Sequence, residues 1–340
     1  MTTTDDAIVL HDVSKSFRAD RGLVRRLRRA PGTAPRAVLD GVSLAVARGE
    51  IFGLVGANGA GKTTLLKILA TVLLPDRGRV QVDGIDALAD PARVRARLAV
   101  VPADERALFW RISATENVRL FASLYGLTGS TRDRAVERAL ALVGLAQAGE
   151  QQVGSFSSGM RQRTLIARAL VTQPSLLILD EPTRSLDPVT ARELRRFIRD
   201  VLCTELGTTI LLATHSTEEA LQLCDRAALL VAGRVVATDS LARLQARTVG
   251  ARVRVRVDAA HAASARTLLH LRDADDATAV DGQVTLEATL PDATHAPIVL
   301  EALVRAGVRV AEFAPMPLTL ADLLDAVTPV PATAGATADA

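Results

Sequence analysis

The sequence of 340 residues contains almost no lysine. Of its 41 basic residues only Lys15, Lys62 and Lys67 are lysines, and the other 38 (41 minus 3) are arginines. A lysine retained against this bias points to a position that needs a compact ammonium instead of a planar guanidinium. The acidic residues nearly balance the basic ones, and a net charge of +3 is too small to indicate nucleic acid as a partner.

Cysteines and long apolar runs are scarce as well. Cys203 and Cys224 have neither metal-site nor redox-pair spacing, which favours two reduced core thiols in a cytoplasmic protein. No apolar run approaches the ~18–20 residues of a membrane-spanning helix. The acidic N-terminus lacks the charged and apolar regions of a signal peptide. We therefore expect a chain that neither spans a membrane nor is exported, and that is free to dock on a membrane protein.

One glycine-rich segment has a specific order. Residues 56–64 read GANGAGKTT and fit G-x-x-x-x-G-K-[ST], the phosphate-binding loop of P-loop nucleotidases. An apolar strand is expected before it at 51–55 and a helix after it at 65–70, which is the setting that the motif requires. Glycines let backbone N–H groups face phosphate oxygens, and the helix N-terminus adds partial positive charge. The expected nucleotide-binding residues are Gly56, Ala57, Asn58, Gly59, Ala60, Gly61, Lys62, Thr63 and Thr64.

Two carboxylates are expected opposite this loop. Asp180 and Glu181 end a buried strand that starts at Leu176. In a P-loop fold, a carboxylate at the C-terminal end of a strand sits across Mg²⁺ from the threonine hydroxyl, here Thr63. Asp180 fits this metal role, and Glu181 is expected to polarise the attacking water. Lys62 is expected to reach the β- and γ-phosphates.

Short apolar strands and helical segments alternate over most of the chain. Continuous apolar strands predict an α/β core with a largely parallel sheet. Helical periodicity over about 112–170 indicates an insertion in that core. Near 246–250 the composition changes, and later elements predict a small α+β domain. We expect a core domain at 1–245 with a helical subdomain at about 105–170, an accessory domain at 250–328 and a disordered tail at 329–340.

Residues 18–36 form an arginine-rich segment after the first strand. One interpretation is a solvated loop. The other is contact with anionic lipid of the inner leaflet, which contributes about 1 kcal/mol for each basic residue near the surface. Salt-sensitive binding to anionic vesicles would separate the two.

Further motifs follow in a recognisable order. The segment 156–163, FSSGMRQR, resembles the signature loop of ABC ATPases in an S-x-G-M variant. Residues 185–187 resemble the D-loop of that family through Asp187, and His215 resembles its H-loop. Phe17 occupies the place of the family's adenine-stacking aromatic. The resemblance covers about residues 7–240, and the expected signature residues are Ser157, Ser158, Gly159 and Met160.

The resemblance implies an ABC ATPase fold, a P-loop NTPase core that binds ATP and Mg²⁺. It also implies an ATP-sandwich dimer, most simply a homodimer, in which the 56–64 loop of one subunit faces Ser157 and Gly159 of the other. The expected helix at 159–170 offers a second N-terminus for phosphate, but the helical insertion holds it far from the loop of its own chain. Lys62 and His215 would stabilise charge on the γ-phosphate.

The sequence departs from the family pattern at one position. The family has a glutamine before the helical insertion that binds Mg²⁺ and water and senses the membrane partner. Here Asp104 occupies that place, with Glu105 beside it. Either Asp104 replaces the glutamine as a ligand of a Mg²⁺-bound water, with a shorter reach, or it belongs to a solvent-facing acidic turn.

The resemblance also suggests the kind of ABC ATPase. The signature variant and residues 320–324, LADLL, resemble ABC-2-type exporters including the daunorubicin-resistance group. Polysaccharide or lipid exporters are the alternative, and a soluble ABC ATPase is a more distant one. An exporter ATPase would need separate integral-membrane permease subunits and would sit at the cytoplasmic face of the cell membrane. We expect the permease to contact the surface around 108–111 and 117–125, where Phe109 is either an interface residue or core.

Overall fold

A computed structural model of the chain describes residues 6–17, 36–247, 251–270, 278–280, 282–292, 294–316 and 319–327. The chain folds as two compact units, Met1–Leu241 and Ala242–Ala340. The sequence predicts this division a few residues later, between 245 and 250. The arginine-rich segment before Arg36 and the tail at 329–340 lie outside the described residues.

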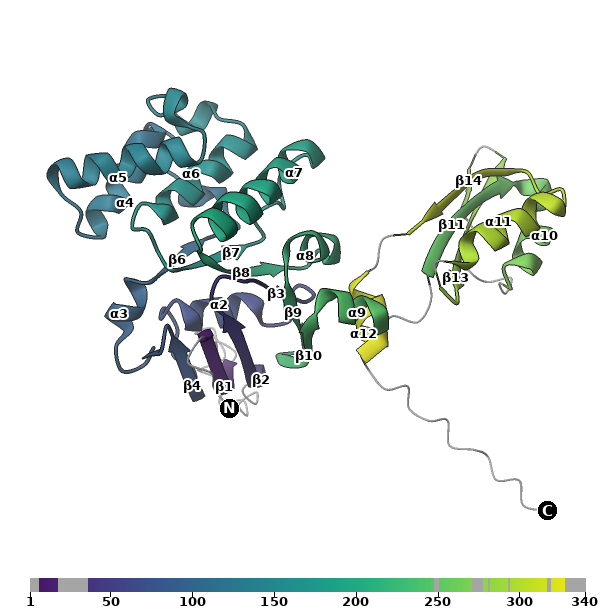
Figure 1. The fold of residues 1–340 in the computed structure, drawn as a ribbon, viewed down its shortest axis with the longest axis horizontal. Helices are drawn as coiled ribbons and strands as arrows, with labels where there is room; N and C mark the ends of the chain where they lie inside the picture. The colour runs from purple at the N-terminus through teal and green to yellow at the C-terminus, as the bar shows by residue number, and fades with distance from the viewer. Residues whose placement is uncertain are drawn as a thin grey trace, which may run out of the picture. The chain divides into compact units, whose positions relative to one another are not determined.

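A six-stranded sheet forms the centre of the first unit (Figure 1). All neighbouring strands in it are parallel except β10, which returns antiparallel to β9. Every residue of β3 and β8 is buried, as expected for strands covered on both faces. The predicted α/β core with a largely parallel sheet is therefore confirmed. The order is β10 (Arg234–Ser240), β9 (Arg226–Val231), β3 (Ile51–Val55), β8 (Thr209–Thr214), β7 (Leu176–Asp180) and β6 (Leu98–Val101).

Helices follow three of the parallel strands. They are α2 (Lys62–Leu69) after β3, α7 (Pro188–Arg196) after β7 and α8 (Thr217–Leu223) after β8. Because the strands are parallel, their carboxyl ends meet at one edge of the sheet, and the loops before these helices meet there too. The sequence predicts one α-helix over 190–204, but α7 continues as a π-helix, η4 (Phe197–Glu205).

A second, antiparallel sheet belongs to the same unit. Its strands are β2 (Arg36–Ala47), β1 (Asp6–Phe17), β4 (Arg77–Val82) and β5 (Ile85–Asp86), in that order. Ile8 and Val42 of this sheet share one buried cluster with Phe52 of β3 and Leu65 of α2. The sequence indicates most of these strands but not that they form a sheet of their own, because apolar runs do not reveal which strands pair.

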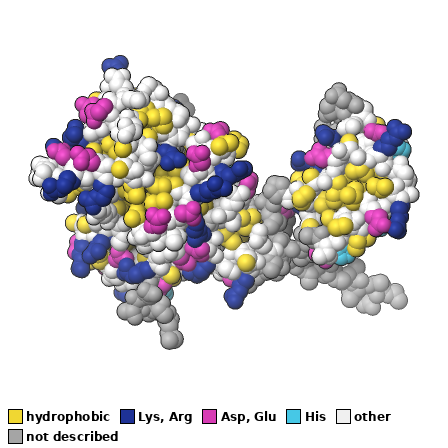
Figure 2. All heavy atoms as spheres, turned by 45° about the horizontal axis from the view of Figure 1, so that its top comes forward, with side chains coloured by type: hydrophobic (Ala, Val, Ile, Leu, Met, Phe, Trp, Pro, Cys, Tyr) yellow, Lys and Arg dark blue, Asp and Glu magenta, His cyan; other side chains and the backbone are white. Residues whose placement is uncertain are grey.

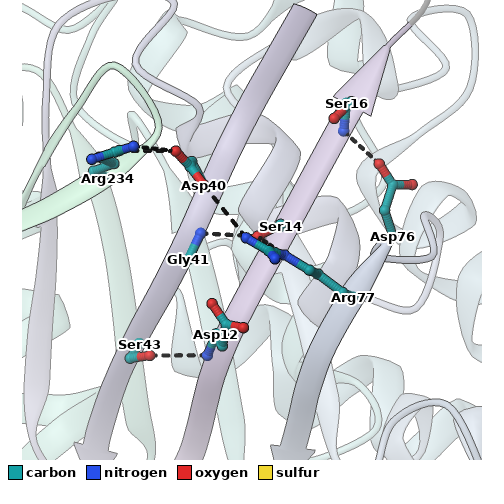
Figure 3. A network of polar contacts seen from close by, with 9 residues as sticks. All are labelled: Asp12, Ser14, Ser16, Asp40, Gly41, Ser43, Asp76, Arg77 and Arg234. Atoms are coloured by element: carbon teal, nitrogen blue, oxygen red, sulfur yellow. Dashed lines mark hydrogen bonds and ion pairs between the residues drawn. The ribbon is translucent and has the colours of Figure 1, made fainter. Parts of the chain in front are cut away.

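Polar contacts connect this antiparallel sheet to the β9–β10 hairpin (Figure 3). The carboxylate of Asp40 in β2 accepts two hydrogen bonds from Arg234 of β10, at 2.9 and 2.5 Å, and lies 3.7 Å from the guanidinium of Arg77 in β4. Ser14 Oγ in β1 accepts from the N–H of Gly41 at 2.9 Å and from Arg77 Nε at 3.1 Å. These bonds fix β2 beside the central sheet.

Three helices between β6 and β7 form the insertion: α4 (Ala114–Leu124), α5 (Gly129–Leu142) and α6 (Ser158–Leu170). A capping box begins α4, in which Ser113 Oγ accepts from the N–H of Glu116 at 3.1 Å and the Glu116 carboxylate accepts from the N–H of Ser113 at 2.8 Å. The α6 helix packs on both α4 and β6, and so belongs to the insertion and to the core. The shorter elements of this part are α3 (Pro91–Arg95), η1 (Glu105–Ala107), η2 (Ala146–Ala148) and η3 (Val153–Ser155).

Cys203 and Cys224 are free and buried, as the sequence predicts. Burial raises the pKa of both thiols, which keeps them neutral. Among the residues that the structure describes, no helix combines the length and the apolar character needed to cross a membrane.

The second unit contains a βαββαβ arrangement with an antiparallel sheet of order β12-β13-β11-β14, the ferredoxin-like pattern. Valines at alternate positions of β11 are buried, whereas Arg254 and Arg256 are exposed and form ion pairs with Glu287 and Glu312. Figure 2 shows hydrophobic side chains gathered on one face of this unit. The elements are α9 (Leu241–Arg247), β11 (Ala251–Asp258), η5 (Ala259–His261), α10 (Ala262–Leu268), β12 (Thr278–Val280), β13 (Gln283–Leu290), α11 (His295–Arg305), β14 (Val310–Pro315) and α12 (Leu320–Val327).

Candidate nucleotide site

The glycine-rich loop joins β3 to α2 at the carboxyl edge of the central sheet, as predicted. At two of its glycines there is no room for a side chain. A Cβ at Gly56 would lie 2.4 Å from the carbonyl oxygen of Leu230, and one at Gly61, where φ is +113°, would lie 2.8 Å from the carbonyl oxygen of Val38. The loop can therefore keep this conformation against its neighbours only with glycine at these positions.

A cavity of about 250 Å³ opens over this loop. The loop lines one side of the cavity, and the end of β7 lines the other. Thus the structure brings the predicted phosphate loop and the predicted carboxylates together. The lining residues are Val38, Ala57, Asn58, Gly59, Gly61, Lys62, Thr63, Thr64, Ala103, Asp180, Glu181 and Arg184.

Lys62 is buried at the floor of this cavity. Its ammonium donates to the carbonyl oxygen of Gly56 at 2.6 Å and to that of Ala57 at 3.3 Å, and it lies 3.9 Å from Glu181 Oε1. Burial lowers the pKa of Lys62, while the charges of Glu181 and Asp180 oppose that change. The ammonium thus points into the loop, where phosphate oxygens would replace neutral carbonyl partners.

Asp180 and Glu181 differ in their surroundings. Burial raises the pKa of Asp180, and the negative charge of Glu181 adds to this, whereas Lys62 and Arg184 oppose it. Glu181 is only 9% exposed, and its Oε2 lies 2.5 Å from Nδ1 of His215, which follows β8. The carboxylate of Glu181 therefore lies between a lysine and a histidine, whereas Asp180 lines the cavity, where the charges of Lys62 and Arg184 offset part of the effect of its burial.

The donors at this edge suit a hard divalent cation. Thr63 and Asp180 both line the cavity and offer a hydroxyl and a carboxylate oxygen, which are ligands that Mg²⁺ prefers. Within the described part of the chain, no cluster of three or more His, Cys, Asp or Glu side chains is suited to hold a metal. A magnesium ion at Thr63 and Asp180 would therefore complete its shell with phosphate oxygens and water.

The signature residues lie elsewhere, at the first turn of α6. Ser157 is the N-cap of this helix, and its Oγ accepts from the N–H of Met160 at 3.2 Å. A Cβ at Gly159 would lie 2.5 Å from Cγ2 of Thr190 in α7, so this turn and the first turn of α7 are in close contact. None of the signature residues lines the described cavity.

Other predicted residues also stand apart from the cavity lining, among them Asp187, Phe17 and Asp104. Asp187 is the N-cap of α7 and accepts from the N–H groups of Val189 and Thr190 at 3.0 Å. Phe17, at the end of β1, is 43% exposed, and the ammonium of Lys15 lies 5.8 Å from its ring centre. The Asp104 carboxylate is exposed and accepts from the N–H of Arg106 at 2.9 Å. Its role in binding Mg²⁺ stays a prediction.

The cavity also contains residues that the sequence does not predict. Val38 lines the cavity because β2 packs beside the loop, and Ala103, the residue before Asp104, lines it as well. Arg184 lies in the loop after β7, where its charge opposes the rise in the pKa of Asp180. Val38 and Ala103 carry no motif, whereas a cation four residues after Asp180 is a signal that could have identified Arg184.

A buried lysine in a phosphate loop, facing paired carboxylates at the edge of a parallel sheet, defines a P-loop nucleotide hydrolase. The family model described as "ABC transporter" matches residues 39–184. The chain is 42% identical over 218 residues to the daunorubicin resistance ATP-binding protein DrrA3 of Streptomyces coeruleorubidus, covering 64% of this chain and 68% of that protein. It is 35% identical over 237 residues to the ABC transporter ATP-binding protein NatA of Bacillus subtilis, covering 70% and 91%. The chain belongs to the ABC transporter family, among its ATP-binding proteins.

Solved structures support the same assignment. The chain superposes on CbiO1 from Clostridium perfringens, part of an ABC transporter complex, with a TM-score of 0.61, 26% identity and coverage of 71% of this chain and 91% of that one. For the dimeric cassette MJ0796 bound to ADP and Pi, the TM-score is 0.58 and the identity is 25%, with coverage of 69% of this chain and 98% of that one. The predictions of the ABC ATPase fold, of ATP binding and hydrolysis, and of an exporter-type subunit are confirmed.

Proposed function

We propose that this chain hydrolyses ATP as a homodimer at the cytoplasmic face of a membrane and drives separate permease subunits that export a compound. The observation that supports it most directly is the convergence of Lys62, Asp180, Glu181 and His215 at one cavity edge. Relatives named for daunorubicin resistance and for fluoroquinolone export support the direction of transport. The compound itself is not expected to touch this chain.

Each residue of the cavity has a chemical role in this proposal. The loop N–H groups and Lys62 hold the phosphates, and Glu181 accepts a proton from, or polarises, the attacking water. His215, 2.5 Å from the Glu181 carboxylate, orients that carboxylate and reaches toward the γ-phosphate. Thr63 and Asp180 would hold Mg²⁺, which when bound neutralises charge on the β- and γ-phosphate oxygens.

The dimer is proposed because the α6 N-terminus lies outside the cavity of its own chain. Ser157 is exposed, and the first turn of α6 offers N–H groups and a partial positive charge. In a head-to-tail pair, Ser157 and Gly159 of one subunit would face the phosphates bound at Lys62 of the other. The dimeric MJ0796 structure, to which the chain is similar, supports such a pairing.

Exposed apolar side chains on the insertion are our candidate contact for the permease. Phe109 is 52% and Trp110 47% exposed, so neither belongs to the core. Leu124 and Tyr125, at the end of α4, are exposed as well. Aromatic residues of this kind are typical anchors of protein interfaces.

The substitution Glu181→Gln tests the assigned water-activating residue. The variant should bind ATP and dimerise but hydrolyse roughly 10²–10⁴-fold more slowly, because the amide cannot accept the proton. The measurements are steady-state phosphate release, nucleotide affinity and dimer formation by light scattering. Glu218→Gln, at an exposed glutamate outside the site, is the matched control. Hydrolysis at the wild-type rate in Glu181→Gln would refute the assignment.

A further inference from the structure

Glu181 has a main-chain conformation that residues with a side chain rarely adopt. Its φ is +50°, in the left-handed region. A residue other than glycine keeps this conformation only where surrounding contacts hold it. The first such contact is the N–H of Glu181, which donates to the carbonyl oxygen of Ala213 in β8 at 2.9 Å. A second anchor lies two residues further along the loop.

That anchor is a buried hydrogen bond from Thr183 to Glu219. Thr183 Oγ1 donates to Glu219 Oε1 at 2.6 Å. Glu219 lies in the first turn of α8 and is only 3% exposed. The N-cap of this helix, Ser216, directly follows His215 in the chain. One side chain therefore joins the loop that carries Glu181 to the helix whose N-cap follows His215.

The direction of the Glu219 side chain is not the one that its local sequence favours. Ser216 and Glu219 have the spacing of a capping box, the motif that Ser113 and Glu116 complete at the start of α4. In α8 only one half of the box forms, in which Ser216 Oγ accepts a hydrogen bond from the N–H of Glu219 at 3.1 Å. The N–H of Ser216 donates instead to Thr214 Oγ1 at 3.0 Å. The carboxylate has turned into the interior.

This interior position is electrostatically unfavourable for a carboxylate. Burial raises the pKa of Glu219, and the charge of Glu181 adds to the rise, whereas Arg195 of α7 opposes it. A neutral or apolar side chain would fill the space without this penalty. The residue that is present provides an acceptor oxygen for Thr183. Glu219 does not line the nucleotide cavity.

We infer that Glu219 is a positioning residue for ATP hydrolysis. By holding Thr183, it keeps the Glu181 carboxylate against His215 and over the cavity, without contacting the nucleotide. The inference rests on the proposed role of Glu181 in activating water. Loss of the Glu219 link should therefore slow the chemical step and leave nucleotide binding intact.

The experiment compares Thr183→Val, Glu219→Ala and their double variant in the full chain. Valine keeps the shape of threonine and removes only the donor. Each single variant should lower kcat about tenfold or more, because one buried charge-assisted hydrogen bond is lost. KM for ATP and the Kd for ADP should stay within about threefold of wild type. The double variant should be no slower than Glu219→Ala, because both changes break one link.

Two further variants make the result specific. Glu219→Gln keeps an acceptor for Thr183 and should retain most of the activity that Glu219→Ala loses. Glu218→Gln, at the exposed neighbour in the same helical turn, should match wild type. If Glu219→Ala does not fold, Thr183→Val decides the question alone.

Several outcomes would overturn the inference. They are an unchanged kcat in Thr183→Val, effects that multiply in the double variant, and losses that appear equally in ADP affinity. The proposed function fails in a different way, through a wild-type chain without ATPase activity or a fully active Glu181→Gln. A hydrolysing wild type with an equally fast Thr183→Val refutes only the role of Glu219.

Discussion

Replacing Gly159 by alanine should force apart two helices whose first turns are in contact. The new Cβ would lie 2.5 Å from Cγ2 of Thr190, a separation that real Cβ atoms essentially never show. The next nearest atoms are Cβ of Thr190 at 3.8 Å and Oγ of Ser157 at 3.9 Å, which are ordinary contacts. One methyl group of Thr190 is therefore the whole obstacle.

The magnitude follows from two opposing effects. Adding a methyl group to a tightly packed contact costs about 1–3 kcal/mol, whereas replacing glycine within a helix returns up to about 1 kcal/mol. The main chain at Thr190 is held in place, because its N–H donates to Oδ1 of Asp187 at 3.0 Å, so the contact is relieved only by moving the side chain or the helix. We expect a net loss of about 1 kcal/mol, which lowers the unfolding midpoint of a unit of this size by about 2–4 °C.

Thr190→Ser provides the decisive comparison, because serine keeps the hydroxyl and lacks Cγ2. In that background Gly159→Ala should be neutral or slightly stabilising, as measured by thermal unfolding of all four proteins. An equal loss in both backgrounds would refute the steric explanation. The same four proteins also test the signature role of this turn. If the double variant regains stability but not ATPase activity, close approach at Gly159 serves the phosphates of the second subunit as well as the packing of α7.

Two further predictions concern positions at which lysine and arginine cannot replace each other. Lys62→Arg should lower kcat/KM by roughly 10²–10³-fold, because the loop encloses a compact ammonium and a planar guanidinium cannot replace it. Lys67→Arg, on the exposed side of the same helix, is the control in the ATPase assay. Similar activity in both variants would contradict the prediction. Arg168→Lys should destabilise the first unit by about 1–2 kcal/mol in thermal unfolding. The reason is that the guanidinium of Arg168 lies 4.1 Å from the ring centre of Phe121 and donates to the carbonyl oxygen of Ala107 at 2.6 Å. An unchanged unfolding midpoint would show that an ammonium makes both contacts.

The parts of the site that the sequence predicts are those fixed by local chemistry. A loop that must approach phosphate needs glycines in order, and Lys62 stands out because nearly every other cation is arginine. Asp180 and Glu181 are identified because charge follows an apolar strand directly. These signals come from neighbouring residues, so no knowledge of the tertiary fold is needed to interpret them.

The parts that the sequence does not predict depend on distant partners. Val38 lines the cavity only because β2 pairs with β1 in a separate sheet and packs beside the loop. The spacing of Ser216 and Glu219 fits a capping box, yet the Glu219 carboxylate accepts a hydrogen bond from Thr183 instead. In the second unit, β12, α9 and α12 carry too few residues for a periodic pattern to identify them.

The charges of the cavity give a physical reason why one chain should not be the complete catalyst. Its described lining contains two cations, Lys62 and Arg184, and two carboxylates, Asp180 and Glu181, so the side-chain charges cancel. A triphosphate therefore needs positive potential from elsewhere. Mg²⁺ bound at Asp180 would supply part of it, and the N-terminus of α6 from a second subunit would supply another part. Glu181 already lies 2.5 Å from His215 in the single chain. We therefore expect that the single chain lacks positive potential at the phosphates and not a positioned carboxylate, which favours hydrolysis after the proposed dimer has formed.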